Sequence, residues 1–344
     1  MVYSGIMNEL AAIPHLDLSA EVSSSRLDEI ITDGRAWTRD SIDPADAAFT
    51  PDAEAQDDLQ NLAKKCQGLH PDDLPTASLP DLTPSLKTFM AKVKASCDTG
   101  LGFAAVDRLN LEGIDIETAT AVSWTLGHAV GRQVAQKWDG SMLYHVTDYG
   151  LKYEYGVRGS YTNVELVFHT DNAFAAMPPD YVSLLCLNAA KKGGVSRFCS
   201  LYTLHNLLLE DHPKALARLY EPLVYDRQAE HAADAPKVSY APMFRWDGKR
   251  LTGRAHHGLI KKGYEIIGTG MDTETKDALS ALEEAISSPD IWVEQHLKRG
   301  QIQFLNNREL AHYRSTFEDH DDPTKKRHLI RSWHRDQGGV GYDG

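Results

Sequence analysis

The chain has 344 residues, of which 42% are hydrophobic and 25% charged, so it is long enough to bury a large core. Its net charge is −13 at pH 7 and no stretch is rich in lysine and arginine, which argues against nucleic acid as a partner. We find no apolar run of about 18 residues and no basic start followed by an apolar segment, so we expect a cytoplasmic protein without a membrane partner. The four cysteines form no C-x-x-C pair and are expected to be idle thiols.

The first 100 residues predict mostly helices. Residues 52 to 65 run from acidic to basic, which complements a helix dipole, and prolines at 75, 80 and 84 mark a loop before a helix over 86 to 95. No linker composition marks a boundary. We therefore expect a single domain over 1–344, in which residues 1–100 flank a catalytic core over 101–336.

The next segment predicts a strand, a helix and a long connection. Residues 102–109 are typical of a strand, and Asp115 opens a helix whose apolar stripe continues through Val122, Leu126, Val130 and Val134. Residues 142–161 then combine glycines with five tyrosines. This composition suits a mobile lid over a pocket, and it suits half-buried strand residues equally well. The tyrosines are Tyr144, Tyr149, Tyr153, Tyr155 and Tyr161.

A histidine and an aspartate end the strand that follows. Val164, Leu166 and Phe168 alternate with other residues, which predicts a strand with one buried face. His169 and Asp171 are two residues apart, so both side chains can face one point and supply two ligands of a 2-His-1-carboxylate iron site. The motif alone is weak, because roughly two H-x-[DE] matches are expected by chance. The chain contains five.

The second half of the chain alternates strands with helical insertions. Residues 181–187 and 300–307 predict strands, 201–219 and 274–286 predict helices, and 264–267 resembles a short strand. Between them, a glycine turn at 192–195 delivers the hydroxyl of Ser196 to the start of another strand. This order favours an α+β, mainly β fold built on a β-sandwich or jelly roll over a β-α-β sheet.

Four motifs in this order resemble those of the Fe(II)/2-oxoglutarate-dependent dioxygenases of the taurine dioxygenase and clavaminate synthase type. They are H-T-D at 169–171, G-G-V-S at 193–196, N-N-R-E-L-A-H ending at 312, and R-H-L-I-R at 327–331. The resemblance covers about residues 100 to 336. It implies a double-stranded β-helix (jelly-roll) core with flanking helices, and an oxidoreductase that uses non-haem Fe(II), 2-oxoglutarate and O2.

The resemblance also implies roles for individual residues. His169, Asp171 and His312 would be the metal ligands, and Arg327 would hold the distal carboxylate of 2-oxoglutarate. Ser196 would share that carboxylate, where the family commonly has threonine. The retained carboxylate Asp171 favours hydroxylation or another oxidation over halogenation. Arg314 could be a second anion contact, but a salt bridge is the favoured interpretation.

Four further residues are candidates for binding the substrate. Arg331, four residues after Arg327, meets an acidic group of the substrate in several relatives, which would imply a small substrate with an anionic end. Glu165 shares the parity of His169 and Asp171 and could receive a cationic group. Asn163 lies on the same strand, and Phe174 would be a pocket wall or a core aromatic. At His256-His257 we expect one histidine near the substrate.

The resemblance therefore implies a hydroxylase of a small polar metabolite that is anionic or amino-acid-like, with release of succinate and CO2. Two alternatives remain open. One is an enzyme of the same family that catalyses desaturation, ring formation or epimerisation, and the other is a non-catalytic jelly-roll protein that binds a ligand. The sequence makes no prediction about the oligomeric state.

Overall fold

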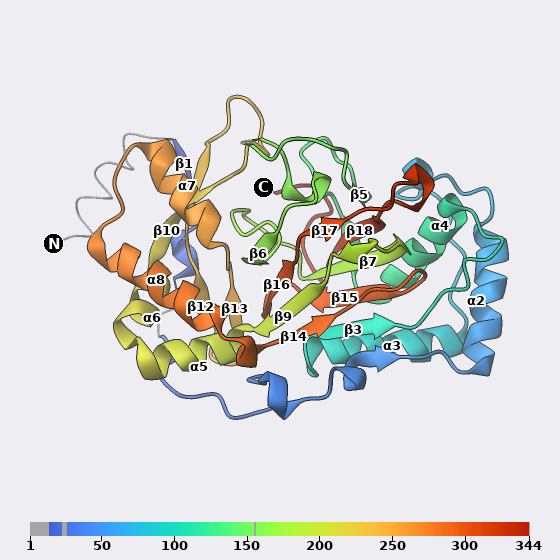
Figure 1. The fold of residues 1–344 in the computed structure, drawn as a ribbon, viewed down its shortest axis with the longest axis horizontal. Helices are drawn as coiled ribbons and strands as arrows, with labels where there is room; N and C mark the ends of the chain where they lie inside the picture. The colour runs from blue at the N-terminus through green and yellow to red at the C-terminus, as the bar shows by residue number, and fades with distance from the viewer. Residues whose placement is uncertain (1–13, 23–25, 155, 344) are drawn as a thin grey trace.

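The computed structural model of the protein describes residues 14–22, 26–154 and 156–343, and within them the chain is a mixture of helices and sheets. Two sheets form the centre of the molecule, and helices lie at both ends (Figure 1). The smaller sheet has the strand order β14-β9-β16-β6, and the larger has the order β2-β3-β15-β7-β18-β4, with β5 also paired to β18.

The strands of the smaller sheet are β6 (Leu166–His169), β9 (Ser196–Ser200), β14 (Trp292–Gln295) and β16 (Leu310–Arg314). Those of the larger sheet are β2 (Ala48–Phe49), β3 (Phe103–Val106), β4 (Arg132–Val134), β5 (Tyr144–Val146), β7 (Tyr181–Asn188), β15 (Ile302–Asn306) and β18 (His328–Arg335). A separate two-stranded ladder joins β8 (Lys192–Gly193) to β17 (Phe317–Glu318).

The two sheets are joined by a shared apolar core. Phe198 and Leu310 of the smaller sheet belong to the same buried cluster as Phe103, Leu305 and Trp333 of the larger one. The rings of Phe103 and Phe198 stack with their centroids 4.7 Å apart. Because alternate residues of a strand face opposite sides, this contact fixes which face of each sheet is internal.

Three helices form one end of the molecule (Figure 1): α2 (Ala53–Cys66), α3 (Pro84–Asp98) and α4 (Ile116–Gly127). Their N-terminal caps are Asp52, Thr83 and Asp115, whose side chains each accept a bond from a backbone N–H of the first turn. They pack in one apolar cluster with residues of β3, β7 and β15 on the face of the larger sheet that points away from the smaller sheet.

The stripe predicted for α4 is too long. The helix ends at Gly127, where a Cβ would lie 2.7 Å from the ring of His334, and Val134 belongs to strand β4. Residues four apart lie on the same face of a helix, but they also lie on the same face of a strand, where side chains alternate every two residues. Val130 and Val134 are both buried although they lie beyond the end of the helix.

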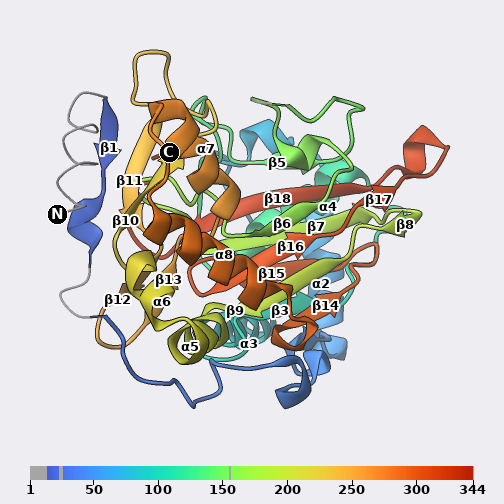
Figure 2. The same cartoon turned by 60° about the vertical axis from the view of Figure 1, so that its left-hand side comes forward.

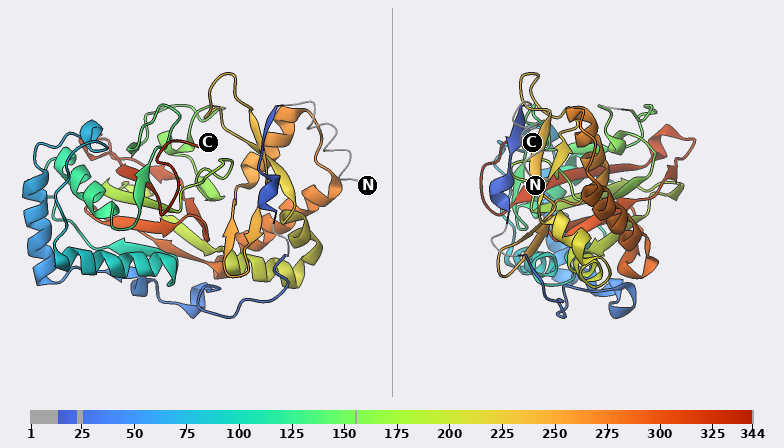
Figure 3. Two further views of the ribbon diagram at one scale, coloured as in Figure 1. Left: turned by 180° about the vertical axis from the view of Figure 1, so that it is seen from behind. Right: turned by 90° about the vertical axis from the view of Figure 1, so that its left-hand side faces the viewer.

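A long insertion between β9 and β14 forms the other end of the molecule, opposite α2 (Figures 2 and 3). It contains α5 (Leu201–Asp211), α6 (Pro213–Leu219), α7 (His257–Ile267) and α8 (Thr273–Ser287). It also contains β10 (Pro222–Asp226), β11 (Val238–Pro242), β12 (Phe244–Trp246) and β13 (Leu251–Gly253). The strand predicted at 264–267 is wrong, because these residues end helix α7, whose Gly263 packs against the backbone of Val224.

The N-terminal region is less helical than predicted. Residues 1–13 lie outside the described part, and β1 (His15–Asp17) joins the insertion by pairing in parallel with β11. Strand β2 pairs in parallel with β3, and within the described part of the chain the first α-helix begins at Ala53, after several short 3-10 turns. In the described residues these turns are η1 (Ser19–Glu21), η2 (Arg39–Ser41), η3 (Pro44–Ala47), η4 (Pro71–Asp73), η5 (Gly159–Tyr161), η6 (Pro289–Ile291) and η7 (Pro323–Lys325).

Two expectations about the whole chain can be compared with the structure. Cys66, Cys97, Cys186 and Cys199 are all buried and form no disulfide. Among the helices of the described ranges, none has the length and apolar character needed to cross a bilayer.

Candidate active site

Two neighbouring strands and the turn after one of them bring three ligand side chains together. His169 ends β6 and lies directly opposite His312 of β16 in the ladder, while Asp171 lies in the turn that follows β6. Oδ1 of Asp171 is 3.4 Å from Nε2 of His169 and 3.5 Å from Nε2 of His312. The three ligand atoms lie within 4.8 Å of one another, so the group could hold a metal ion.

The hydrogen bonds of the histidines favour neutral metal ligands. Nδ1 of His169 is 2.7 Å from the backbone oxygen of Val167, which can only accept, so Nδ1 carries the proton and Nε2 is free. Burial and the neighbouring His169 lower the pKa of His312, against the opposing effect of Asp171. Nδ1 of His312 is buried without a partner among the described residues.

The two oxygens of Asp171 have different environments. Burial would raise the pKa of this carboxyl, but Arg331 and the adjacent imidazoles of His169 and His312 hold the pKa well below its usual range. Oδ2 accepts from Nη1 of Arg331 at 2.9 Å and from the indole Nε1 of Trp333 at 2.8 Å. Oδ1 is therefore the oxygen that faces the two imidazoles.

A cavity of about 60 Å³ next to the three ligands contains two buried arginines. Arg327 is 4% exposed and Arg314 6% exposed, and Ser196, at the start of β9, lines the same cavity. Burial lowers the pKa of Arg327 to about 10. Burial and Arg327 lower the pKa of Arg314 to about 9. The salt bridge expected for Arg314 is absent from the described residues, where its Nη2 donates to backbone carbonyls instead.

A larger pocket of about 250 Å³ also borders His169 and Asp171. Phe174 is a buried part of its wall, and Glu165 lines it while accepting a hydrogen bond from the hydroxyl of Tyr313. Arg158 and Glu230 form an ion pair at its edge, each side chain 15% exposed. Asn163 is exposed and does not line this pocket.

Arg331 already has several partners at this pocket. Besides its bond to Asp171, its Nε donates to Oε1 of Gln136 at 2.8 Å, and its guanidinium lies 4.6 Å from the ring centroid of Tyr144. Its side chain keeps 12% exposure. Arg331 thus borders both the metal-ligand group and the pocket.

His256 lies near the site as expected for one of the two adjacent histidines. It caps α7, and its ring centroid is 5.5 Å from that of His169. Burial, together with His169 and His257, holds its pKa well below the usual value. His257 points elsewhere and lies 3.5 Å from Glu283.

Sequence reasoning missed Trp333, Arg158, Glu230 and Gln136. Trp333 could have been found, since it is two residues past Arg331 and faces the same side of β18. Arg158 and Glu230 belong to connections 72 residues apart, and no spacing in the sequence relates them. The segment expected to form a lid includes exposed Tyr149 and Tyr153, while Tyr155 lies outside the described residues.

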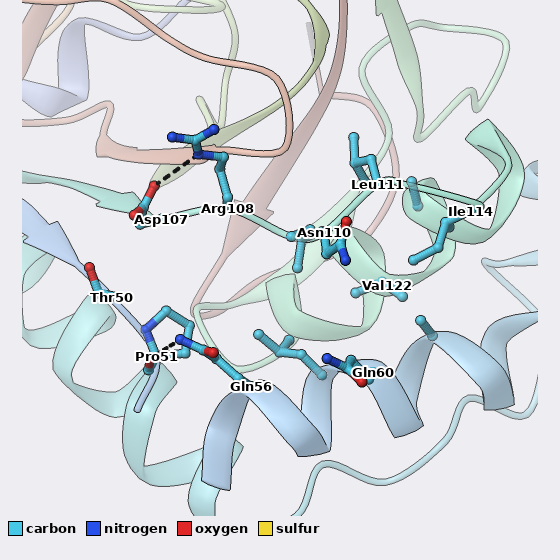
Figure 4. Close-up of a pocket in the computed structure, with 14 residues that line it drawn as sticks. Thr50, Pro51, Gln56, Gln60, Asp107, Arg108, Asn110, Leu111, Ile114 and Val122 are labelled. Carbon is cyan, nitrogen blue, oxygen red and sulfur yellow. Dashed lines mark hydrogen bonds and ion pairs between the residues drawn. The ribbon is translucent and has the colours of Figure 1, made fainter. Parts of the chain in front are cut away.

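A second pocket of about 250 Å³ lies between α2, α4 and the connection after β3 (Figure 4). Its lining is largely apolar. Its two charged residues are Asp107 and Arg108, and Oδ1 of Asp107 lies 3.8 Å from Nε of Arg108. It has no histidine and only one carboxylate, so it lacks the ligands of a metal site.

Comparison with known proteins identifies the family. Residues 62–333 match the model of the family described as "Taurine catabolism dioxygenase TauD, TfdA family". The chain belongs to this family. It is therefore an Fe(II)- and 2-oxoglutarate-dependent dioxygenase, as the motifs predicted, and a small molecule is its expected substrate.

Similar proteins cover most of the chain. FR-33289 synthase of Streptomyces rubellomurinus is 26% identical, over 88% of this chain and 89% of that protein. The taurine hydroxylase-like protein SAT17 of Stachybotrys chartarum is 29% identical, over 62% of this chain and 54% of that protein. Among solved structures, an asparagine oxygenase bound to Fe(II), hydroxyasparagine and succinate has a TM-score of 0.64 at 20% identity, covering 83% of this chain and 93% of that one.

The non-haem iron oxygenase OrfP, in complex with Fe and α-ketoglutaric acid, superposes with a TM-score of 0.61. It is 16% identical, and the match covers 84% of this chain and 94% of that one. At these identities the structural matches show a shared fold, in which helices and sheets are mixed as they are here.

Proposed function

We propose that the enzyme hydroxylates an unactivated C–H bond of a small polar metabolite that is anionic or amino-acid-like, with His169, Asp171 and His312 as the iron ligands. The observation that carries the proposal is the donor set itself. Two imidazole nitrogens and one carboxylate oxygen meet at one point, and the remaining oxygen of Asp171 is held by Arg331 and Trp333. This donor set suits Fe(II) and leaves coordination positions free. We further infer that the two central sheets form the double-stranded β-helix of the family.

The bound iron would activate O2 for oxidation of 2-oxoglutarate and of the substrate. The side chains of this chain have the supporting tasks. Arg327 and Ser196 would bind the distal carboxylate of 2-oxoglutarate, a role supported by their shared cavity and by the unpartnered Nη1 of Arg327. Val167 would fix the tautomer of His169 through its carbonyl, and Arg331 and Trp333 would keep Oδ1 of Asp171 pointed at the metal.

The charges around the larger pocket support an anionic or zwitterionic substrate. Arg158 and Arg331 both line this pocket, and their guanidinium carbons lie 5.0 and 4.6 Å from the ring centroid of Tyr144. This cationic wall would bind an acidic group, whereas Glu165 on another wall could bind an ammonium group. Structures of the fold neighbours contain hydroxyasparagine and hydroxy-L-arginine, which have both kinds of group.

Desaturation, ring formation or epimerisation by the same site is the second candidate, since these outcomes need the same ligands and differ in where the substrate lies. Product mass separates the outcomes: hydroxylation adds one oxygen, and desaturation removes two hydrogens. The deciding experiment is a screen of amino acids and small organic acids for substrate-dependent succinate release by the Fe(II)-loaded protein. If the protein binds 2-oxoglutarate but no compound in the screen raises succinate release above the rate without substrate, the proposed substrate class is contradicted.

A further inference from the structure

The two buried arginines beside the metal ligands have donors without acceptors. In the part of the chain that the structure describes, Nη1 of Arg327 and both Nε and Nη1 of Arg314 are buried and make no hydrogen bond. The guanidinium carbons of Arg314 and Arg327 lie 5.0 and 5.1 Å from the ring centroid of Phe317. The two buried guanidinium groups therefore both lie near the ring of Phe317.

No carboxylate of the described residues forms an ion pair with either arginine. Asp319 accepts a hydrogen bond from the backbone N–H of Arg327 at 2.7 Å, and its charge acts on the Arg327 guanidinium only from a longer distance. Burial of two adjacent cations with no carboxylate in direct contact is unfavourable, and so is burial of donors without acceptors. Both defects are removed if an anion enters the cavity.

The strand pairing places Arg314 on the side of the smaller sheet that faces this cavity. His312 and Arg314 are two residues apart on β16 and so face the same way. In the ladder, Arg314 lies directly opposite Ser196 of β9. The strand register therefore brings a metal ligand, a hydroxyl and a guanidinium to one cavity, which is completed by Arg327 from the connection directly before β18.

Arg314 is held in place by one of its nitrogens. Its Nη2 donates to the carbonyl of Gly159, which lies within the lid candidate at residues 142–161, and to those of Thr162 and Val164 just after it. These contacts fix the side chain and leave Nε and Nη1 for a ligand. Because a guanidinium donates from all three nitrogens, Arg314 can serve the chain and an anion together.

We propose that Arg314 is a second arginine of the 2-oxoglutarate site, and that the distal carboxylate of the co-substrate binds between Arg314, Arg327 and Ser196. The inference rests on the proposed function and deepens it. It assigns to Arg314 a direct share of co-substrate affinity, instead of the salt bridge predicted from the sequence. It also makes Arg314 a link between the co-substrate cavity and residues 159–164.

The test uses glutarate, which has the distal carboxylate of 2-oxoglutarate but lacks the keto group that chelates iron. Calorimetric titration of the metal-free protein with glutarate therefore reports on this cavity alone. We expect Arg314→Gln and Arg327→Gln each to weaken binding at least tenfold, and Arg314→Lys to recover part of the loss. Arg197→Gln is the matched control, because Arg197 is on the adjacent strand and pairs with Glu294 outside the cavity.

A second measurement covers the case in which glutarate binds too weakly to titrate. The same order of affinities is expected for 2-oxoglutarate added anaerobically to the Fe(II)-loaded proteins and followed by the visible charge-transfer band of the chelate. If Arg314→Gln only lowers the midpoint of thermal unfolding and binds both ligands as the wild type does, Arg314 is structural and the inference is overturned. If the wild type binds no 2-oxoglutarate with Fe(II), the proposed function itself fails.

Discussion

Trp333 offers a sharp test of how the carboxylate ligand is held. Replacing it with phenylalanine keeps an aromatic ring in the core and removes the indole N–H that donates to Oδ2 of Asp171 at 2.8 Å. A hydrogen bond to a charged group contributes about 1.5–3 kcal/mol. Since about 1.4 kcal/mol corresponds to a factor of ten, loss of this bond should weaken metal binding by roughly 10- to 100-fold. Arg331 would still hold the same oxygen, so binding should not be abolished.

The assay is a competition titration of the metal-free protein with Co(II) or Fe(II) against a chelator under anaerobic conditions. The matched control is Trp124→Phe, because Trp124 is equally buried and its indole nitrogen has no partner among the described residues. The control should bind metal as the wild type does. If Trp333→Phe and Trp124→Phe both bind metal with wild-type affinity, the idea that the indole of Trp333 orients Asp171 is refuted.

Three further predictions follow from other contacts. Arg158→Gln should raise KM for the substrate at least tenfold and leave KM for 2-oxoglutarate unchanged. The reason is that Arg158 pairs with Glu230 at the substrate pocket and does not line the co-substrate cavity. Steady-state assays of succinate formation measure both KM values, and a parallel rise in the two would contradict this prediction. Gly193→Ala should lower the free energy of unfolding by about 2 kcal/mol or more, since φ at Gly193 is +76° and a Cβ would lie 2.2 Å from the backbone oxygen of Thr316. Gly270→Ala is the control, because a Cβ at Gly270 would meet no atom within 4 Å. Urea unfolding of the two variants and the wild type measures the difference. Burial lowers the pKa of His205 to about 4. The unfolded state therefore takes up a proton first as pH falls below about 6.5, and stability is lost toward pH 4. His205→Leu should remove up to about 3 kcal/mol of that loss, and equal pH dependence in variant and wild type would contradict the assignment.

The sequence predicted best those residues whose roles depend on neighbours along the chain. His169 and Asp171 are two residues apart where β6 ends, and their side chains meet as predicted although Asp171 lies in the turn after the strand. His312, more than 140 residues later, needed the family resemblance. The structure places it opposite His169 in the same ladder.

Periodicity failed where two regular structures share a spacing. Val134 continued a helical stripe in the sequence but belongs to a strand paired with β18. Residues 264–267 are apolar enough for a strand but complete the buried face of helix α7. In both cases packing against a distant element decided the outcome, and this is information that a short window of sequence does not contain.

Long-range charge pairing was equally hidden from the sequence. Arg314 was expected to form a salt bridge, and its described surroundings supply carbonyls instead of a carboxylate. Arg331 was expected to face the substrate, and it also supports a ligand of the metal site. Both roles depend on which strands become neighbours, and the order of strands in the sheets is not the order in the chain.

The central claim is that His169, Asp171 and His312 hold Fe(II) beside a 2-oxoglutarate site built on Arg327. The most direct test is anaerobic titration of the metal-free protein with Fe(II) and 2-oxoglutarate, following the weak visible charge-transfer band of the chelate in the wild type, His312→Ala and Arg327→Ala. We predict a band in the wild type that is lost in His312→Ala and needs far more 2-oxoglutarate in Arg327→Ala. A wild type without the band, or a band that neither substitution changes, would contradict the account.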